Sequence, residues 1–423
     1  MSSDLPHFSP TLAPDLAKGL ELANENSVSS SQECEHFPRC GGCQTLDQPY
    51  LDQLSLKQKT IEKVFQAFPQ MEIRPILGCT DPRGYRYKVQ LPFGWDAQNR
   101  QVLVGCFATG SHEVINQKSC LVQDSELSAL AYAMRAWAQE EGLSVYDETK
   151  QIGCLRHLIL RKGFGTGEVL AGLVIHNRQT IRDRHWDSLR CRLQQALGNR
   201  APALKGLVAL VNADPGNTVL IGEEELIWGQ ADIDENLNGL HFRLRANTFF
   251  QVNPAQAIHL FNAAVSPFES GQRVLDLYCG TGTFTQWAAR KTGYAEGWEA
   301  NVHSVAAAKL AAAANGLTNE TNFEIANIRD RLPILAASAA AIHKNQNWDA
   351  VIVDPPRKGL DASTCHALNS MNNTRLVYVS CNPNSLQRDL QRLQASYAVI
   401  SLQPVDMMPH TRHIECVVHL KRK

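Results

Sequence analysis

Cys381 is the residue in this sequence best suited to covalent chemistry. It lies in the segment VYVSCNPNSL, directly after an apolar stretch and before a predicted helix. A helix N-terminus stabilises a thiolate, so we expect the pKa of this thiol to lie below its usual value of about 8.5. A thiolate is a nucleophile that adds to electron-poor carbon. A cysteine at a strand end is also common as buried core filler, and its position alone leaves both interpretations open.

A second set of residues has the spacing of a nucleoside-binding site. The segment DLYCGTGTF, residues 276–284, places Gly280 and Gly282 after an apolar strand, and Glu299 ends the next strand. Glycines allow a ligand to approach the backbone, and an acidic strand end accepts hydrogen bonds from ribose hydroxyls. Thr285 replaces the third glycine of the dinucleotide pattern, which favours S-adenosylmethionine, a cofactor without phosphate. A plain structural turn beside a solvated Glu299 is the alternative.

The segment DPPRKG, residues 354–359, suggests the kind of methyl acceptor. A carboxylate and a backbone carbonyl at such a turn are common in methyltransferases that act on planar bases. Arg357 stands where methyltransferases of amino groups carry an aromatic residue, which argues against a purine nitrogen. Carbon 5 of uracil fits better with Cys381. A thiolate adds to carbon 6, the resulting enolate attacks the methyl group, and a base then removes the carbon-5 proton.

Three cysteines near the N-terminus form the pattern C-x5-C-x2-C, namely Cys34, Cys40 and Cys43, and Cys120 follows farther along the chain. The chain has 12 cysteines and no recognisable export signal, so we expect a reducing, cytoplasmic compartment in which thiols can serve as ligands. The spacing fits either an iron–sulfur cluster or a zinc site completed by His36.

Strands and helices must bring these residues together. From residue 273 to the C-terminus, short apolar strands alternate with helices, which predicts a parallel sheet. Such sheets bind ligands beyond the carboxyl ends of their strands, where the glycine turn, Asp354 and Cys381 are expected to lie. Residues 50–68 are predicted to form a helix with an apolar face that docks onto another part of the protein, and residues 1–33 a disordered tail.

At this point the motifs resemble those of the RNA uridine-5-methyltransferase family. The resemblance rests on FFQVNP (residues 249–254), DLYCGTGTF, DPPRKG, SCNP and MMPHTRHIECV (residues 407–417), in the family's order, and extends from Cys34 to the C-terminus. It implies an α/β fold, with a Rossmann-like S-adenosylmethionine-dependent methyltransferase domain over residues 241–423. An α+β iron–sulfur and RNA-recognition domain over residues 34–240 precedes it.

The resemblance also implies roles for single residues. Cys381 would be the nucleophile, and Glu415 the base that removes the carbon-5 proton. Without the family, Glu415 would be only a charged residue in a C-terminal strand. The family's cofactor-contacting positions correspond here to Gln251, Tyr278, Thr283, Glu299, Asn327 and Asp354.

The cysteine segment CGGCQ resembles the cluster-bearing members of the same family. It implies a 4Fe-4S iron–sulfur cluster held by Cys34, Cys40, Cys43 and Cys120. The 33 residues before Cys34 are too few for the N-terminal β-barrel of many members, which favours the barrel-less type that acts on 23S rRNA. The alternatives are a tRNA uridine-5-methyltransferase and a catalytically silent RNA-binding protein. The joint presence of Asp354, Cys381 and Glu415 argues against the silent protein.

Composition sets few further limits. The chain has 423 residues and a formal net charge of −1, so charge alone gives no sign of a nucleic-acid partner. LRHLILRK, residues 155–162, is a candidate RNA-binding strand or a basic sheet edge. No apolar run approaches the roughly 18–20 residues that span a bilayer. The family resemblance implies RNA as the partner, and we expect no membrane contact and a monomer.

Overall fold

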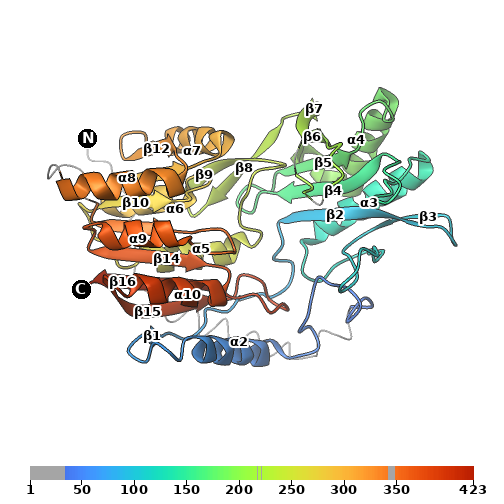
Figure 1. The fold of residues 1–423 in the computed structure, drawn as a ribbon. Coiled ribbons are helices and arrows are strands. Elements are labelled where there is room, and N and C mark those ends of the chain that lie inside the picture. Colours follow the sequence, from blue (N-terminus) through green and yellow to red (C-terminus); the bar gives the residue numbers. More distant parts are fainter. Residues whose placement is uncertain (1–33, 217, 221, 342–347) are drawn as a thin grey trace.

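The computed structural model describes residues 34–216, 218–220, 222–341 and 348–423 (Figure 1). The predicted tail, residues 1–33, lies outside the described residues. Within them, the chain forms an eight-stranded sheet, a six-stranded sheet and a two-stranded hairpin. No helix of this part of the chain is long and apolar enough to cross a membrane.

The larger sheet contains five adjacent parallel strands, which end at the edge strand β12. The strand order is β1 (Glu72–Ile73), β15 (Tyr397–Val405), β16 (Glu415–Arg422), β14 (Arg375–Ser380), β13 (Ala350–Val353), β10 (Arg273–Leu277), β11 (Tyr294–Glu299) and β12 (Thr321–Ile325). The strands β10 to β14 run parallel to their neighbours among themselves, whereas β16 pairs antiparallel with β14 and β15. The carboxyl ends of the five parallel strands therefore meet at one edge.

Helices cover both faces of this sheet (Figure 1). They are α5 (Pro254–Val265), α6 (Thr283–Thr292), α7 (Val302–Ala314), α8 (Ile328–Ala341), α9 (Ala362–Ser370) and α10 (Pro383–Leu393). Successive strand residues point to opposite faces, so Val274 packs with Phe284 of α6 whereas Leu275 lies in the core that holds Leu386 of α10. Burial on both faces explains why these strands are continuous apolar runs.

The helix α2 (Tyr50–Val64) packs beside α10 on the same face of this sheet, and β1 extends the sheet by pairing in parallel with β15. Figure 1 shows both elements beside β15 and α10. Ile61 and Phe65 are buried in the same core as Leu386. Gln387 of α10 donates a hydrogen bond from Nε2 to the carbonyl of Val64 at 2.9 Å. The helix predicted over residues 50–68 thus ends earlier than expected and contacts the larger sheet.

The smaller sheet has the order β3 (Gln101–Val104), β2 (Lys88–Asp96), β4 (Leu155–Lys162), β5 (Val169–Ile175), β6 (Leu204–Val211) and β7 (Glu223–Gly229). Its neighbours are antiparallel except β5 and β6, which α4 (Asp183–Leu197) and the 3-10 helix η2 (Gly198–Ala203) connect. The helix α3 (Ser125–Glu140) packs on it through Leu127, Met134 and Trp137.

The hairpin of β8 (Asp232–Leu237) and β9 (Leu240–Arg245) lies between the two sheets (Figure 1). Its inward residues Ile233 and Phe242 belong to one continuous core with Val208 of β6 and Phe284 of α6. The predicted domain boundary after residue 240 falls within this hairpin, and the division into residues 34–240 and 241–423 stays a prediction.

The prediction for residues 155–162 is wrong in both its forms. This segment is β4, which lies inside the sheet between β2 and β5, and Arg156 and Arg161 are buried. The Arg156 guanidinium donates to the carbonyls of Asn212 at 2.8 Å and Asp214 at 2.6 Å. These cations therefore satisfy backbone carbonyls inside the protein, and they form neither an exposed RNA grip nor a sheet edge.

Candidate active site at the carboxyl edge of the larger sheet

The predicted site residues follow consecutive strands of the larger sheet. Tyr278 follows β10, Glu299 ends β11, Asn327 lies after β12, Asp354 follows β13, and Cys381 follows β14. Since all five strands are parallel, these positions lie along one edge, as the alternation of strands and helices predicts.

The glycine turn after β10 adopts a left-handed backbone. Tyr278, Gly280 and Gly282 have φ values of 66°, 54° and 77°. A Cβ atom on Gly282 would lie 2.5 Å from Cε1 of Phe323, so packing excludes any larger residue there. A Cβ atom on Gly280 would meet nothing within 4 Å, so the backbone at Gly280 faces open space. Gly282 caps α6, whose first residue is the predicted cofactor contact Thr283.

Glu299 links the ends of three neighbouring strands. Its Oε2 accepts a hydrogen bond from the backbone nitrogen of Gly280 at 3.2 Å, and its Oε1 accepts from that of Asn301 at 2.8 Å. Its carbonyl accepts from the backbone nitrogen of Ala326 at 2.8 Å, which holds the exposed Asn327 nearby. The spacing of Gly280 and Glu299 in the sequence thus corresponds to a direct contact, with a carboxylate fixed beside the open turn.

A carboxyl group that sequence reasoning did not single out lies beneath this turn. Asp276 of β10 is fully buried and its Oδ2 accepts a hydrogen bond from the hydroxyl of Thr285 at 2.6 Å. Its Oδ1 has no partner among the described residues. Burial, together with the nearby charge of Asp354, raises the pKa of Asp276 to about 8. In the sequence, Asp276 is one polar residue within the apolar strand β10. Only its contact with Thr285 of α6 identifies it as part of the site.

Strand pairing brings Cys381 and Glu415 together. Ser380 of β14 pairs with Cys416 of β16 in an antiparallel register. The next residue on β14 therefore faces the preceding residue on β16, and these are Cys381 and Glu415. Cys381 is exposed and Glu415 is half-buried. The thiol and the carboxyl group, 34 positions apart in the sequence, thus lie side by side at the edge where the glycine turn opens.

The two carboxyl groups of this edge oppose each other's ionisation. Burial raises the pKa of Asp354, and burial together with the charge of Asp354 raises the pKa of Glu415 well above its usual value. A second negative charge is therefore disfavoured, and one of the pair retains a proton to higher pH than an ordinary carboxyl group.

The expectation of a lowered pKa for Cys381 is wrong for this structure. Partial burial and the charges of Glu415 and Asp354 raise the pKa of the thiol, and the charge of Arg357 and a backbone hydrogen bond oppose them. The helix α10 begins after Asn382, whose side chain accepts a hydrogen bond from the backbone nitrogen of Asn384 at 3.1 Å. The helix end is thus capped by Asn382 instead of by the thiolate.

The loops that carry Asp354 and Cys381 are fastened to each other. The carbonyl of Arg357 accepts hydrogen bonds from Asn382 Nδ2 at 3.0 Å and from Ser385 Oγ at 3.1 Å. The charge of Arg357 acts on the Cys381 thiol. The loop that carries this thiol therefore fixes the backbone of Arg357.

Gln251 lies half-buried in the segment that precedes α5. Asn253 caps α5, and its Nδ2 donates to the carbonyl of Met407 at 3.1 Å. The carbonyl of Val252 accepts from the backbone nitrogen of Tyr87 at 2.9 Å. This segment is therefore held between the smaller sheet and the loop that leads into Glu415.

The predicted ligand Cys43 interacts electrostatically with the other three predicted cysteine ligands. Burial raises the pKa of Cys43 to about 12, and the charges of Cys120, Cys40 and Cys34 act on it in the same direction. Cys40 instead interacts with Cys106, a thiol absent from the predicted set, and its sulfur accepts from Gln117 Nε2 at 3.3 Å. In the described part of the chain, no group of three or more His, Cys, Asp or Glu could hold a metal ion. The arrangement of these side chains does not bear out the predicted cluster site.

Comparison with known proteins gives a consistent set of matches. Residues 49–423 match the family model for tRNA (Uracil-5-)-methyltransferase. An uncharacterized RNA methyltransferase of Leptospira interrogans is 38% identical over 392 residues, which cover 92% of this chain and 98% of that protein. One of Gloeobacter violaceus is 36% identical over 413 residues, covering 96% of this chain and 86% of that protein.

A solved structure resembles the whole described fold. It is the tRNA (uracil-54, C5)-methyltransferase of Pyrococcus abyssi in complex with S-adenosyl-L-homocysteine. The two chains share 26% identity and a TM-score of 0.71, and the match covers 90% of this chain and 86% of that one.

Proposed function

Because this chain belongs to the tRNA (uracil-5-)-methyltransferase family, we propose that it transfers a methyl group to carbon 5 of a specific uridine in RNA. It is an S-adenosylmethionine-dependent RNA methyltransferase with the mixed α/β fold of that class, as the sequence predicts. The observation that best supports the uridine reaction is the pairing of β14 with β16, which sets a thiol beside a carboxyl group at the ligand edge.

The reaction is a covalent addition followed by elimination. The Cys381 sulfur forms a bond to carbon 6 of uracil, and the electron pair of the ring double bond moves so that carbon 5 becomes nucleophilic. Bound S-adenosylmethionine supplies the electrophilic methyl group. Glu415 then takes the carbon-5 proton, the double bond re-forms, and the bond from carbon 6 to sulfur breaks. Glu415 must be ionised for this step, and its raised pKa makes the ionised carboxylate a stronger base.

The cofactor lies, in this proposal, over the open turn at Gly280. Glu299 accepts hydrogen bonds from the ribose hydroxyls, since its carboxylate is already fixed beside that turn. The remaining contacts come from Gln251, Tyr278, Thr283, Asn327 and Asp354.

The proposal also names the class of RNA that is methylated. We propose 23S rRNA, the class of RNA that the resemblance of the motifs implies. The second candidate is tRNA, which is favoured by the likeness to the tRNA (uracil-54, C5)-methyltransferase of Pyrococcus abyssi.

The 4Fe-4S cluster remains a proposal that is separate from the reaction. Its support is the sequence pattern of Cys34, Cys40, Cys43 and Cys120, and it would take no part in the methyl transfer. Iron and acid-labile sulfide are to be measured in protein purified without oxygen. About four of each per chain would support the cluster, and their absence would contradict it.

The function is tested with S-adenosylmethionine labelled in its methyl group and separate pools of unmodified ribosomal RNA and tRNA. Nucleoside mass spectrometry then identifies the product. Labelled 5-methyluridine in one pool supports the reaction and names the RNA class. Label on any other nucleoside, or in neither pool, contradicts the proposal.

A further inference from the structure

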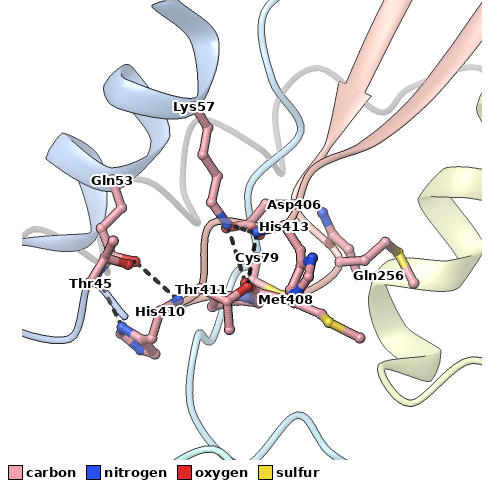
Figure 2. Close-up of polar contacts among 12 residues, drawn as sticks. Thr45, Gln53, Lys57, Cys79, Gln256, Asp406, Met408, His410, Thr411 and His413 are labelled. Carbon is pink, nitrogen blue, oxygen red and sulfur yellow. Dashed lines mark hydrogen bonds and ion pairs between the residues drawn. The ribbon is translucent and has the colours of Figure 1, made fainter. Parts of the chain in front are cut away.

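The loop of residues 406–414 connects β15 to β16 and leads directly into Glu415. Figure 2 shows that side chains of α2 point into this loop from the N-terminal part of the chain. Lys57 donates from Nζ to Oδ1 of Asp406 at 2.7 Å and to the carbonyl of Met408 at 3.2 Å. The Lys57 side chain is 5% exposed and that of Asp406 is 0% exposed, so the ion pair is shielded from water.

The second carboxylate oxygen of Asp406 is also engaged. The hydroxyl of Tyr50 donates to Oδ2 at 2.9 Å and itself accepts from the backbone nitrogen of Cys79 at 2.8 Å. The backbone nitrogen of Asp406 donates to the carbonyl of Leu77 at 2.9 Å. Asp406 is therefore held from the side chain and from the main chain.

A second contact between α2 and the loop involves Gln53 and His410. The backbone nitrogen of His410 donates to Gln53 Oε1 at 3.0 Å, and Gln53 Nε2 lies 3.1 Å from Nδ1 of His410. The carbonyl of His410 accepts from the backbone nitrogens of Gln44 at 2.8 Å and Thr45 at 3.2 Å. His410 has a φ of 63°, an uncommon conformation that these contacts maintain.

Burying an ion pair contributes less to the stability of a protein than its close contact suggests. Removing two charges from water carries a penalty, and apolar residues of similar volume often stabilise a protein as well or better. What the pair adds is direction, because each hydrogen bond fixes an atom of the loop. Helix α2 is a rigid support for this purpose, since Ile61 and Phe65 anchor it in the core of the larger sheet.

The fixed point lies next to Glu415. Val405 of β15 pairs with Glu415 of β16, and Asp406 is the next residue after Val405. At the other end of the loop, Thr411 Oγ1 donates to the carbonyl of Met408 at 2.7 Å, the same carbonyl that Lys57 contacts. A shift of the loop at Asp406 would therefore move the strand end that carries the Glu415 carboxyl group.

We propose that Lys57 and Asp406 are positioning residues that hold Glu415 at the reacting carbon. The inference rests on the proposed function, in which Glu415 removes the carbon-5 proton. The pair does not touch the substrate, and it acts through the loop of residues 406–414. Its loss slows the proton removal more than the steps before it.

The first test replaces Lys57 by Met, which removes the ammonium group and keeps the length of the side chain. We expect kcat to fall on the order of 10- to 100-fold, as small misplacements of catalytic groups do. The Kd for S-adenosylmethionine should change by less than about threefold, which corresponds to less than about 0.7 kcal/mol of binding free energy. A methylated covalent RNA adduct should accumulate on denaturing gels, because the carbon-5 proton is then removed too slowly for the adduct to resolve.

A matched control is Lys162→Met. Lys162 also pairs with carboxylates, Asp124 at 2.9 Å and Glu126 at 2.7 Å, but it lies in the smaller sheet. This variant should accumulate no adduct. An adduct with the control variant as well would overturn the inference, because any weakened ion pair would then give the same signature.

The double variant Lys57→Met with Asp406→Leu separates positioning from stability. It leaves no uncompensated charge, so its urea midpoint should return towards that of the wild type. Turnover should stay low and the adduct should persist. If turnover recovers together with stability, the pair serves stability alone and the inference is wrong.

The wild-type protein distinguishes the two levels of the proposal. Absence of 5-methyluridine from every RNA pool with the wild type defeats the proposed function and this inference with it. A wild type that forms 5-methyluridine, beside a Lys57→Met variant of equal kcat and no adduct, defeats the inference alone.

Discussion

Cys381 and Glu415 lie together because β14 and β16 pair, and two further groups adjust their chemistry. Asp354 raises the pKa of both, whereas Arg357 lowers that of the thiol. Addition of the thiolate to uracil places negative charge on the ring, so a cation near the thiol favours that step. A nucleophile kept largely as the thiol until RNA arrives is also less exposed to oxidation.

The first prediction concerns Cys381→Ala. We expect turnover to fall by at least about 10³-fold, because the proposed bond to carbon 6 is made by the sulfur that this change removes. The affinity for S-adenosylmethionine should stay within about twofold. Calorimetry and the methylation assay check both. Cys191→Ala, which removes another exposed thiol on α4, is the matched control and should retain full activity.

The second prediction concerns Glu415→Gln. The amide cannot take up the carbon-5 proton, so the methylated adduct with RNA should persist and appear as a shifted band on a denaturing gel. The double variant with Cys381→Ala should show no such band. Normal release of product by Glu415→Gln would assign the base role to another group.

The third prediction concerns the buried carboxyl group of Asp276. Its pKa is about 8 in the folded protein and about 3.9 in the unfolded chain, so the folded state binds more protons between these values. The free energy of unfolding contributed by this group therefore falls as pH rises from about 4 to about 8. Asp276→Asn should lose this dependence, so urea unfolding from pH 5 to 8 should show the difference between the two proteins growing with pH. Parallel curves would contradict the prediction.

At the scale of elements, the turn after β10 contributes both to the stability of the fold and to the proposed binding of the cofactor. Gly282 is required by packing against Phe323, whereas Gly280 faces open space. The two glycines have similar φ values but different neighbours, so substitution at each should affect a different property.

The fourth prediction compares Gly282→Ala with Gly280→Ala. Gly282→Ala combines a strained backbone with a clash and should reduce the free energy of unfolding by about 2–5 kcal/mol. Gly280→Ala should cost only about 1–2 kcal/mol of strain but weaken S-adenosylmethionine binding at least about tenfold. Urea unfolding and calorimetry of each variant separate the two effects. Equal losses of affinity in both would contradict it.

The elements that sequence could predict are those with a repeated local pattern. The alternation after residue 273 predicts the five parallel strands, and the contact of Gly280 with Glu299 follows from it. Pairing between distant segments leaves no such pattern. The strand β1 has two residues, and Lys57 meets Asp406 across 349 positions. The sequence of β4, with its arginines, looks like that of a surface strand. These arginines are buried, and a sequence does not show which carbonyls a guanidinium will contact.

At the scale of the whole molecule, the candidate site depends on segments from both ends of the chain. Residues of α2 support the loop before Glu415, and the hairpin of β8 and β9 joins the cores of the two sheets. Glu415 itself could be assigned a role only by resemblance, since it is one charged residue at the start of a strand. The roles of Cys381 as nucleophile, of Glu415 as base and of the residues around Gly280 in cofactor binding remain predictions.

The pairing of β1 with β15 also has a consequence for synthesis of the protein. Ile73 of β1 pairs with Leu402 of β15, so the ribosome synthesises β1 329 residues before the strand with which it pairs. At about 5–20 residues per second, the ribosome takes roughly 15 to 65 seconds to supply it. During that time the apolar face of α2 has left the ribosome without the core that covers Ile61 and Phe65. The last strands to be translated therefore complete the burial of α2, and until then its exposed apolar face favours aggregation of the nascent chain.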